Sequence, residues 1–146
     1  MKIKWENKEL KAFTKRIGNI SRFEKYCKDA TRELAKVLHQ MLLQYTPVKT
    51  GRLRAAWNDK SNLSYKVKQI DGGFEVTLIN SAANEKGEKY GIWVNDGHRS
   101  FNQFGGTYGF VKGKFFVEKS IVETEAKANE VIYKELKKWF RWCCGG

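Results

Sequence analysis

Apolar side chains recur every three or four positions over residues 21–45. That spacing predicts an amphipathic helix of about seven turns with one face packed in the core. Thr46-Pro47 ends the pattern, because proline lacks a backbone donor and disfavours helical geometry in the residue before it. We expect His39 to lie on the polar flank of this helix. The apolar face consists of Phe23, Cys27, Ala30, Leu34, Val37, Leu38, Met41, Leu42 and Tyr45.

A second helical period runs from Lys114 to Trp142, with charges of both signs in its gaps. It predicts a long C-terminal helix whose outer flank faces solvent. Residues 1–20 are charged and only weakly periodic, which fits an N-terminal extension or a short helix with Phe13, Ile17 and Ile20 on one face.

Between the helices, apolar and polar residues alternate over 65–69 and 74–78, with a glycine turn at 71–73. This alternation predicts a β-hairpin with one buried face. A short apolar run follows the hairpin. We expect its Tyr90 and Trp93 to pack in the core beside the strands.

Residues 97–113 combine five glycines with four aromatic side chains, which predicts a flexible loop or a long-tipped hairpin. No repeat or linker divides the chain. We therefore expect residues 1–146 to form a single α+β domain. In it, a long N-terminal amphipathic helix and a C-terminal helix pack on a small antiparallel β-sheet.

The net charge of +12 is concentrated at one end of the chain. Residues 1–60 carry 15 basic and 6 acidic side chains, a surplus of nine. Such a basic half favours polyanions, either nucleic acid or an acidic protein surface. A solvated basic face that keeps subunits soluble explains the surplus equally well.

The chain carries no recognisable catalytic or metal-binding motif. Asp96 and His98 could form a pair, but a turn uses such polar residues for backbone reasons. Carboxylates are scattered, the three cysteines lack metal-ligand spacing, and the glycines of 105–113 are too irregular for a dinucleotide fingerprint. We expect a protein without enzymatic activity, cofactor, metal or small-molecule substrate.

The cysteines and the apolar runs of the chain bear on its compartment and on membrane contact. Cysteines without a disulfide framework fit synthesis in a reducing cytoplasm. Residues 1–7 lack the apolar stretch of a secretion signal, and no run approaches the length that spans a bilayer. We expect no membrane partner.

Three segments, in chain order, resemble one protein family. They are TPVKTGRLRAAW at 46–57, YGIWVNDGHR at 90–99 and GFVKGKFF at 109–116. The combination is similar to the gene-product-ten-like tail-component family of long-tailed phages and prophages, and the similarity covers roughly residues 20–140. Lys112 departs from the family pattern, in which proline is common at this position.

The resemblance implies a structural virion protein of the head–tail junction or tail, acting as a neck or tail-completion component. It implies a ring of identical subunits, for example a hexamer, next to head-closure, tail-terminator or tail-tube proteins. Two alternatives stay open: a tail terminator, and a nonspecific nucleic-acid-binding protein that uses the basic N-terminal half.

Two groups of residues are candidates for the subunit interface or for the ring lumen. Basic side chains could pair with carboxylates of a neighbouring subunit or contact passing DNA, although a solvated turn would look the same. The aromatic residues could order on docking with a neighbouring ring, or fold onto their own sheet. The candidates are Lys49, Arg52, Arg54, His98, Arg99, Phe101, Phe104, Tyr108 and Phe110.

Overall fold

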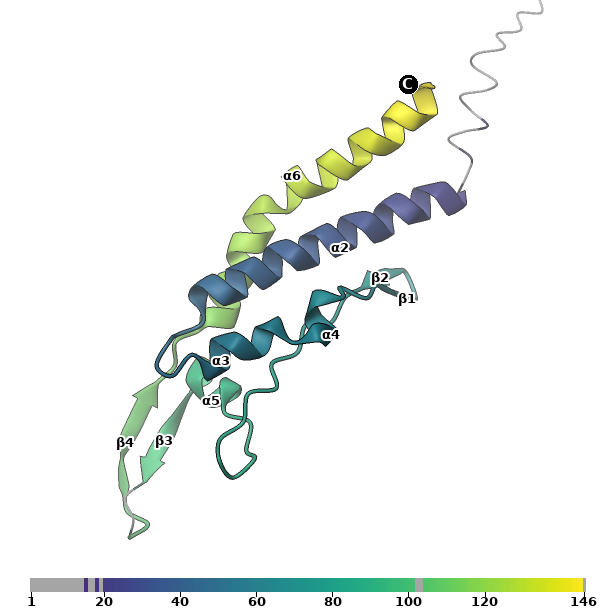
Figure 1. Cartoon of the computed structure of the whole chain (residues 1–146). Helices are drawn as coiled ribbons and strands as arrows, with labels where there is room; N and C mark the ends of the chain where they lie inside the picture. The colour runs from purple at the N-terminus through teal and green to yellow at the C-terminus, as the bar shows by residue number, and fades with distance from the viewer. Residues whose placement is uncertain (1–14, 16–17, 19, 102–103, 146) are drawn as a thin grey trace, which may run out of the picture.

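A computed structural model describes residues 15, 18, 20–101 and 104–145 (Figure 1). The α+β class is confirmed. The prediction for Phe13 and Ile17 lies outside the described residues. The elements are α2 (Ile20–Tyr45), α3 (Arg52–Ala55), η1 (Ala56–Asn58), α4 (Lys60–Leu63), β1 (Lys68–Ile70), β2 (Gly73–Glu75), α5 (Gly91–Asp96), β3 (Gly97–Phe101), β4 (Thr107–Lys112) and α6 (Phe116–Cys144).

The two predicted long helices are present and lie side by side, running in opposite directions (Figure 1). α2 ends at Tyr45, directly before Thr46-Pro47, as the sequence predicts. α6 begins at Phe116 and extends to Cys144. The short elements α3, η1 and α4 follow the other side of α2, so α2 is covered by α6 on one side and by this segment on another (Figure 1).

The core lies where the C-terminal half of α2, the α3–η1 segment and the start of α6 meet. Leu42, Leu53, Trp57, Ala82 and Phe116 form one cluster of buried apolar residues. Hydrogen bonds fix the indole within it, because Trp57 Nε1 donates to Thr46 Oγ1 over 2.9 Å, and Thr46 Oγ1 donates to the Leu42 carbonyl. Leu53 and Trp57 therefore both pack inward from the α3–η1 segment.

The prediction for His39 is wrong: its side chain is buried, with 3% of its surface exposed. The reason is that the flank of α2 that the sequence marks as polar is covered by the chain that follows α4. There the His39 Nδ1 atom lies 2.7 Å from the Tyr65 hydroxyl, with which it shares a hydrogen bond.

Residues 46–63 show no regular apolar period in sequence, yet they contain two helical turns and a 3-10 turn. Gly51 has φ +76°, a conformation that glycine adopts without strain, and it is the N-cap of α3. The polar residue before it, Thr50, is a candidate cap by residue type but does not cap this helix. At the next helix, Asp59 caps α4 and accepts hydrogen bonds from the Ser61 hydroxyl and amide, which lower the pKa of its carboxyl.

The strands form two separate two-stranded antiparallel sheets. In the first, β1 pairs with β2 in the register Lys68↔Glu75, around the predicted glycine turn. This hairpin is shorter than predicted and lacks the buried face expected for it, because β1 is exposed along its whole length. In the second sheet, β3 pairs with β4, so the hairpin alternative for residues 97–113 is confirmed.

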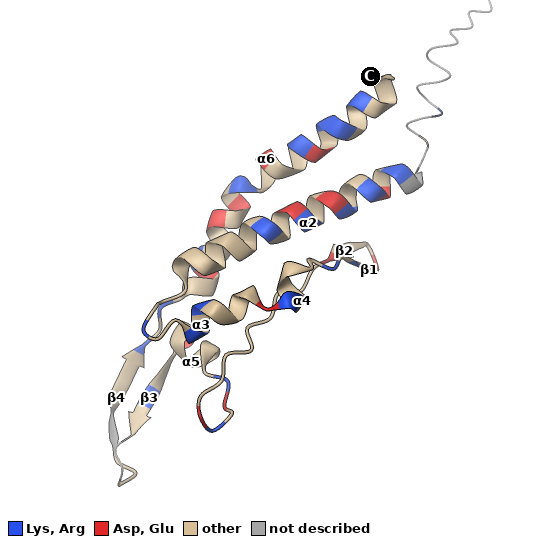
Figure 2. Cartoon of the chain, in the orientation of Figure 1, with Lys and Arg blue, Asp and Glu red and all other residues tan. Residues whose placement is uncertain are grey.

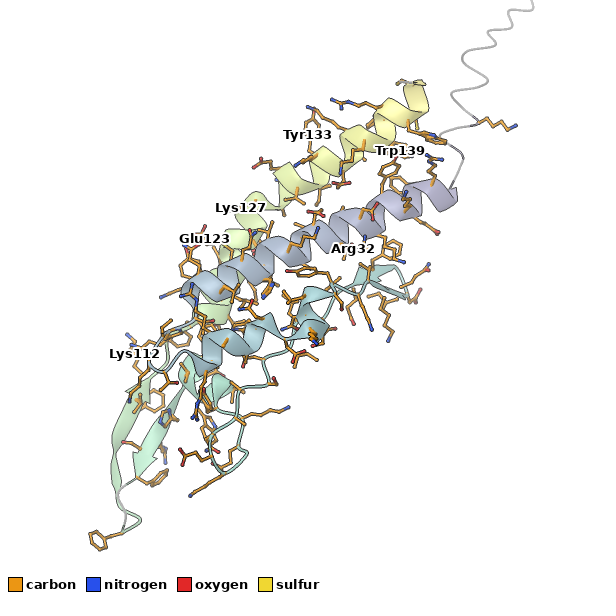
Figure 3. The ribbon with its side chains drawn as sticks, in the orientation of Figure 1. Arg32, Lys112, Glu123, Lys127, Tyr133 and Trp139 are labelled. Atoms are coloured by element: carbon orange, nitrogen blue, oxygen red, sulfur yellow. The ribbon has the colours of Figure 1, made fainter. Side chains whose placement is uncertain are left out.

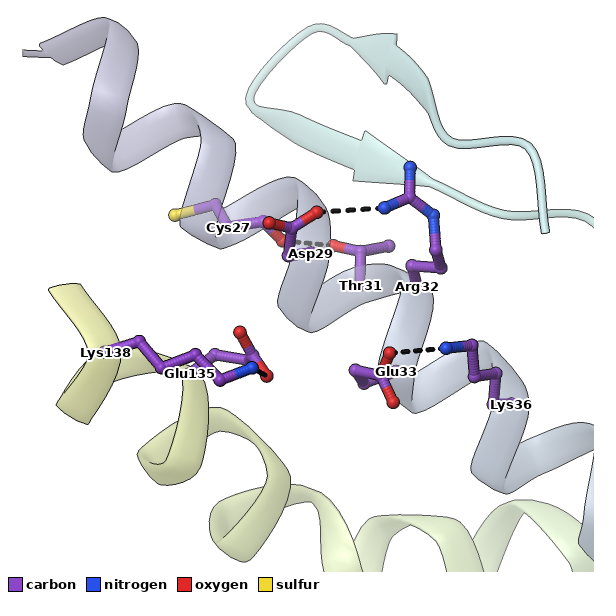
Figure 4. Close-up of polar contacts among 8 residues, drawn as sticks. All are labelled: Cys27, Asp29, Thr31, Arg32, Glu33, Lys36, Glu135 and Lys138. Atoms are coloured by element: carbon purple, nitrogen blue, oxygen red, sulfur yellow. Dashed lines mark hydrogen bonds and ion pairs between the residues drawn. The ribbon is translucent and has the colours of Figure 1, made fainter.

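Ion pairs between residues one turn apart lie along α2 and α6 (Figure 4). Along α2, Arg32 pairs with Asp29 at 2.9 Å and Lys36 with Glu33 at 2.6 Å. The Glu135 carboxylate of α6 is buried and is neutralised by Lys138 one turn away. The hydrogen bond from Lys138 to Glu135 raises the pKa of the lysine, so this buried carboxylate keeps a charged partner.

Candidate functional site

A groove of about 780 Å³ opens between the loop before α3, the loop 84–88, α5 and the base of the β3–β4 hairpin. It is built from parts of all three segments that carry the family resemblance, although these lie far apart in the sequence. It is lined by Pro47, Lys49, Thr50, Gly51, Arg52, Leu53, Asn84, Glu85, Lys86, Glu88, Tyr90, Trp93, Val94, His98, Val111, Lys112 and Lys114.

The groove has apolar walls and a positively charged rim. Five Lys or Arg side chains line it against two carboxylates, those of Glu85 and Glu88. Leu53, Val94 and Val111 supply apolar wall surface. Figure 2 shows the basic residues on α3 and near the base of the hairpin. Such a surface attracts acidic or mixed partners and offers apolar area for a side chain to bury.

The structure separates the predicted basic candidates into two groups. Lys49, Arg52 and His98 line the groove. Arg54, on α3, and Arg99, on β3, are exposed but do not line it. Arg52 and Arg54 both point away from the core, as predicted, because Leu53 between them is buried.

Trp93 does not pack in the core, contrary to expectation. Its side chain is 42% exposed, whereas Tyr90 does pack against the core cluster. The short apolar run forms the helix α5, so successive side chains point in different directions around the helix. Trp93 lies on the side that faces the groove. There its ring lies 6.4 Å from that of His98, whose Nδ1 is 3.5 Å from the Trp93 carbonyl oxygen.

The aromatic candidates lie on the β3–β4 hairpin, which extends away from the helices (Figure 1). Phe101, Phe104 and Phe110 are exposed at 63%, 87% and 65% of their surface. The side chain of Tyr108 lies outside the described residues. Exposed phenylalanine on a projecting hairpin is unfavourable in water and typical of surfaces that are covered by another protein.

Comparison with protein families gives a match over residues 11–97 to the HK97-gp10-like family, described as "Bacteriophage HK97-gp10, putative tail-component". The match spans more than half of the chain. The chain belongs to this family. The predicted resemblance is thereby confirmed. No curated protein and no solved structure matches the chain.

As a member of the HK97-gp10-like family, the protein is a phage tail component, and it works in the virion together with other phage structural proteins. The matched region runs from the segment before α2 to the first residue of β3. It includes the groove residues of the first two motif segments except His98. The rest of the β3–β4 hairpin and α6 lie beyond the match.

Asn95 ties α5 and the hairpin of this tail component to the start of α6. Its buried side chain donates from Nδ2 to both Glu118 carboxylate oxygens at 3.0 Å, and its Oδ1 accepts from the Val117 amide at 3.0 Å. The Asn95 carbonyl also accepts from the Phe115 amide at 2.9 Å. These contacts do not follow from local pattern, because Asn before Asp-Gly is a common turn signal.

We expect Asn95→Ala to lower the free energy of unfolding by about 2–3 kcal/mol, because it leaves the Val117 amide and a carboxylate without their partner. Urea denaturation of the purified protein measures the loss. Asn58→Ala, at an exposed position, serves as the control and should change stability by less than about 0.5 kcal/mol. Equal effects of the two substitutions would contradict the role of Asn95.

Asp96 and His98, which could have formed a pair, have other partners. The Asp96 carboxylate accepts a hydrogen bond from Asn95, and His98 faces Trp93. Among residues 15, 18, 20–101 and 104–145 no three His, Cys, Asp or Glu side chains are grouped so that they could hold a metal ion. No helix in the same part of the chain has both the length and the apolar character to cross a membrane.

Proposed function

We propose that this tail component is a neck or tail-completion protein, without enzymatic activity, that forms a ring and docks to a neighbouring virion layer through its β3–β4 hairpin. The observation that carries the proposal is the exposure of Phe101, Phe104 and Phe110 on a hairpin held away from the helices. Burying one such side chain against a partner contributes about 1.5–3 kcal/mol, so three of them can anchor an interface.

Contacts between ring subunits belong to the same proposal. Lys49 and Arg52 on the groove rim, and Arg54 and Arg99 beside it, pair with carboxylates of the next subunit. Such a contact joins two different surfaces, and it closes into a ring where the rotation between subunits fits. We also propose that residues 1–146 form one domain, which is supported by the core cluster drawn from α2, α3, η1, the segment before α5 and α6.

The double substitution Phe101→Ser/Phe104→Ser tests the docking role. Losing two buried rings should weaken docking by about 3 kcal/mol or more, roughly a hundredfold. Complementation of a phage that lacks this gene should then yield mainly unjoined heads and tails, counted by electron microscopy. The hairpin lies outside the core, so the variant should unfold at the wild-type temperature.

The matched control is Ile70→Ser/Ile79→Ser, which removes two exposed apolar side chains that lie outside the β3–β4 hairpin. It should leave the number of joined virions unchanged. Wild-type yields from the phenylalanine variant would remove the docking proposal.

A second candidate function is contact with DNA, either in the lumen of the ring or as nonspecific binding by the free protein. Lys49, Arg52 and Arg54 are exposed together near the start of α3, and Arg side chains grip phosphates. Titration with random duplex at several salt concentrations separates the readings. Tight binding with a steep salt slope favours DNA, and weak binding that Arg52→Gln/Arg54→Gln leaves unchanged favours the protein partner.

Localisation by electron microscopy distinguishes a neck position from that of a tail terminator.

A further inference from the structure

α6 carries a second apolar stripe on the side that does not face α2. Its first stripe includes Phe116, Trp139 and Cys143, which are buried. The second, which we name the outer seam, follows steps of four, three, four, three and four residues. The outer seam consists of Val122, Ala126, Asn129, Tyr133, Leu136 and Phe140.

Most of the outer seam is uncovered within the described chain, and Leu136 is half-buried. Val122, Tyr133 and Phe140 are 63%, 59% and 47% exposed, and Ile132 beside them is also exposed. Figure 3 shows Trp139 between α6 and α2, and Tyr133 on the other side of α6. Alternating steps of four and three, with one polar Asn, are the pattern by which helices pair along a coiled-coil seam. A second helix is therefore the partner that this surface fits.

We propose that the outer seam binds the outer seam of a second copy of this chain, with the two α6 helices antiparallel. In the register that aligns all six positions, Val122 meets Phe140, Ala126 meets Leu136 and Asn129 meets Tyr133 of the other copy. Each pair joins a smaller residue to a larger one, so the space between the helices fills evenly. Ile132 meets its own counterpart at the two-fold axis.

The charges that flank the outer seam favour this orientation. The exposed Glu123 lies opposite Lys137 of the second copy, and two-fold symmetry makes this contact twice. Lys137 is held at the edge of the seam, with its Nζ atom 4.6 Å from the centre of the Tyr133 ring. A parallel pair in register would instead place Glu125 opposite Glu130 of the other helix, which is repulsive.

One like-charge contact opposes the antiparallel pair, because Glu130 meets Glu130 at the axis. Lys134 lies one turn after it on each helix and offsets that repulsion. The net charge of +12 per copy acts over longer distances and is screened at physiological salt.

This pairing goes beyond the proposed ring. A two-fold contact uses the same surface on both copies and closes at two, so it cannot propagate around a ring. It describes the free protein before it enters the particle. Its failure would leave the hairpin docking and the ring untouched, because they use other surfaces.

Light scattering after size-exclusion chromatography gives the first test. The purified full chain should show twice its 17.0 kDa mass at physiological salt. Tyr133→Glu/Phe140→Glu should halve the measured mass, whereas the control Leu63→Glu/Ile79→Glu, which adds the same charge at two exposed apolar positions outside α6, should leave it unchanged. A single-chain mass at every concentration up to millimolar, or a dimer that the seam variant leaves intact, would overturn the proposal.

Charge exchange gives the second test and fixes the orientation. Glu123→Lys or Lys137→Glu alone should weaken the dimer about tenfold, and the two together should restore it. Fourteen residues separate these positions, about 21 Å along one helix, so restoration must come from contact between two chains. A double variant at least as weak as the single ones would refute the antiparallel register. Circular dichroism confirms that α6 stays helical in each variant.

Discussion

Trp57→Ala is expected to lower the free energy of unfolding by about 3–5 kcal/mol, the range for losing a buried aromatic side chain. Trp57 contacts the cluster formed by Leu42, Leu53 and Phe116, which joins α2, α3 and α6. Its removal leaves a cavity at the meeting point of three elements that cannot all move to fill it. A domain of this size has only about 5–15 kcal/mol of total stability, so this loss is a large share of it.

Urea denaturation followed by circular dichroism measures this effect. Trp57→Phe keeps most of the ring volume but loses the 2.9 Å hydrogen bond to Thr46, and should cost about 1–2 kcal/mol. Trp93→Ala, at an exposed tryptophan, is the matched control. If the Trp57 and Trp93 variants lost equal stability, the core would not be centred where the structure places it.

Gly113→Ala should also be strongly destabilising, by about 3 kcal/mol, or a fall in Tm of roughly 10 °C for this chain length. Gly113 joins β4 to α6, and a Cβ atom there would lie 2.5 Å from the Asp96 carbonyl carbon and 2.8 Å from its oxygen. These are backbone atoms of α5, so the clash can be relieved only by moving α5 away from the start of α6. The Asn95 hydrogen bonds would stretch as a result.

Differential scanning calorimetry measures the change in Tm. Gly73→Ala is the control, because a Cβ atom at Gly73 meets nothing within 4 Å and that glycine does not adopt a positive φ. A Gly113 variant that melts within 2 °C of this control would show that the connection between β4 and α6 can accommodate a Cβ atom.

The long helices were predictable from sequence because each buries one continuous face against the other, which imposes a regular period of apolar residues. The short helices were not. α5 has only six residues, fewer than two turns, so its pattern cannot be told from that of a strand or a loop. α4 depends on its cap at Asp59 rather than on any apolar period.

The candidate site was predictable in its parts and not in its arrangement. The exposure of Phe101, Phe104 and Arg52 follows from local pattern. The groove does not, because it forms only where the loop at Lys49 and the strand at Lys112 approach across the fold. The same holds for His39, whose burial depends on Tyr65, a residue 26 positions further along the chain.

The β3–β4 hairpin leaves and rejoins the body of the protein at one place. The Lys114 amide donates to the Val94 carbonyl at 3.0 Å and the Phe115 amide to the Asn95 carbonyl at 2.9 Å, so both ends of the hairpin are fastened to the same helical turn. Two strands fixed at a common root behave as a stiff arm. Tension applied at the tip is therefore delivered to the first turn of α6 and, through Phe116, to the buried cluster beside α2. If the hairpin docks to a neighbouring layer as proposed, each arm carries load from that contact into the buried core of its own subunit.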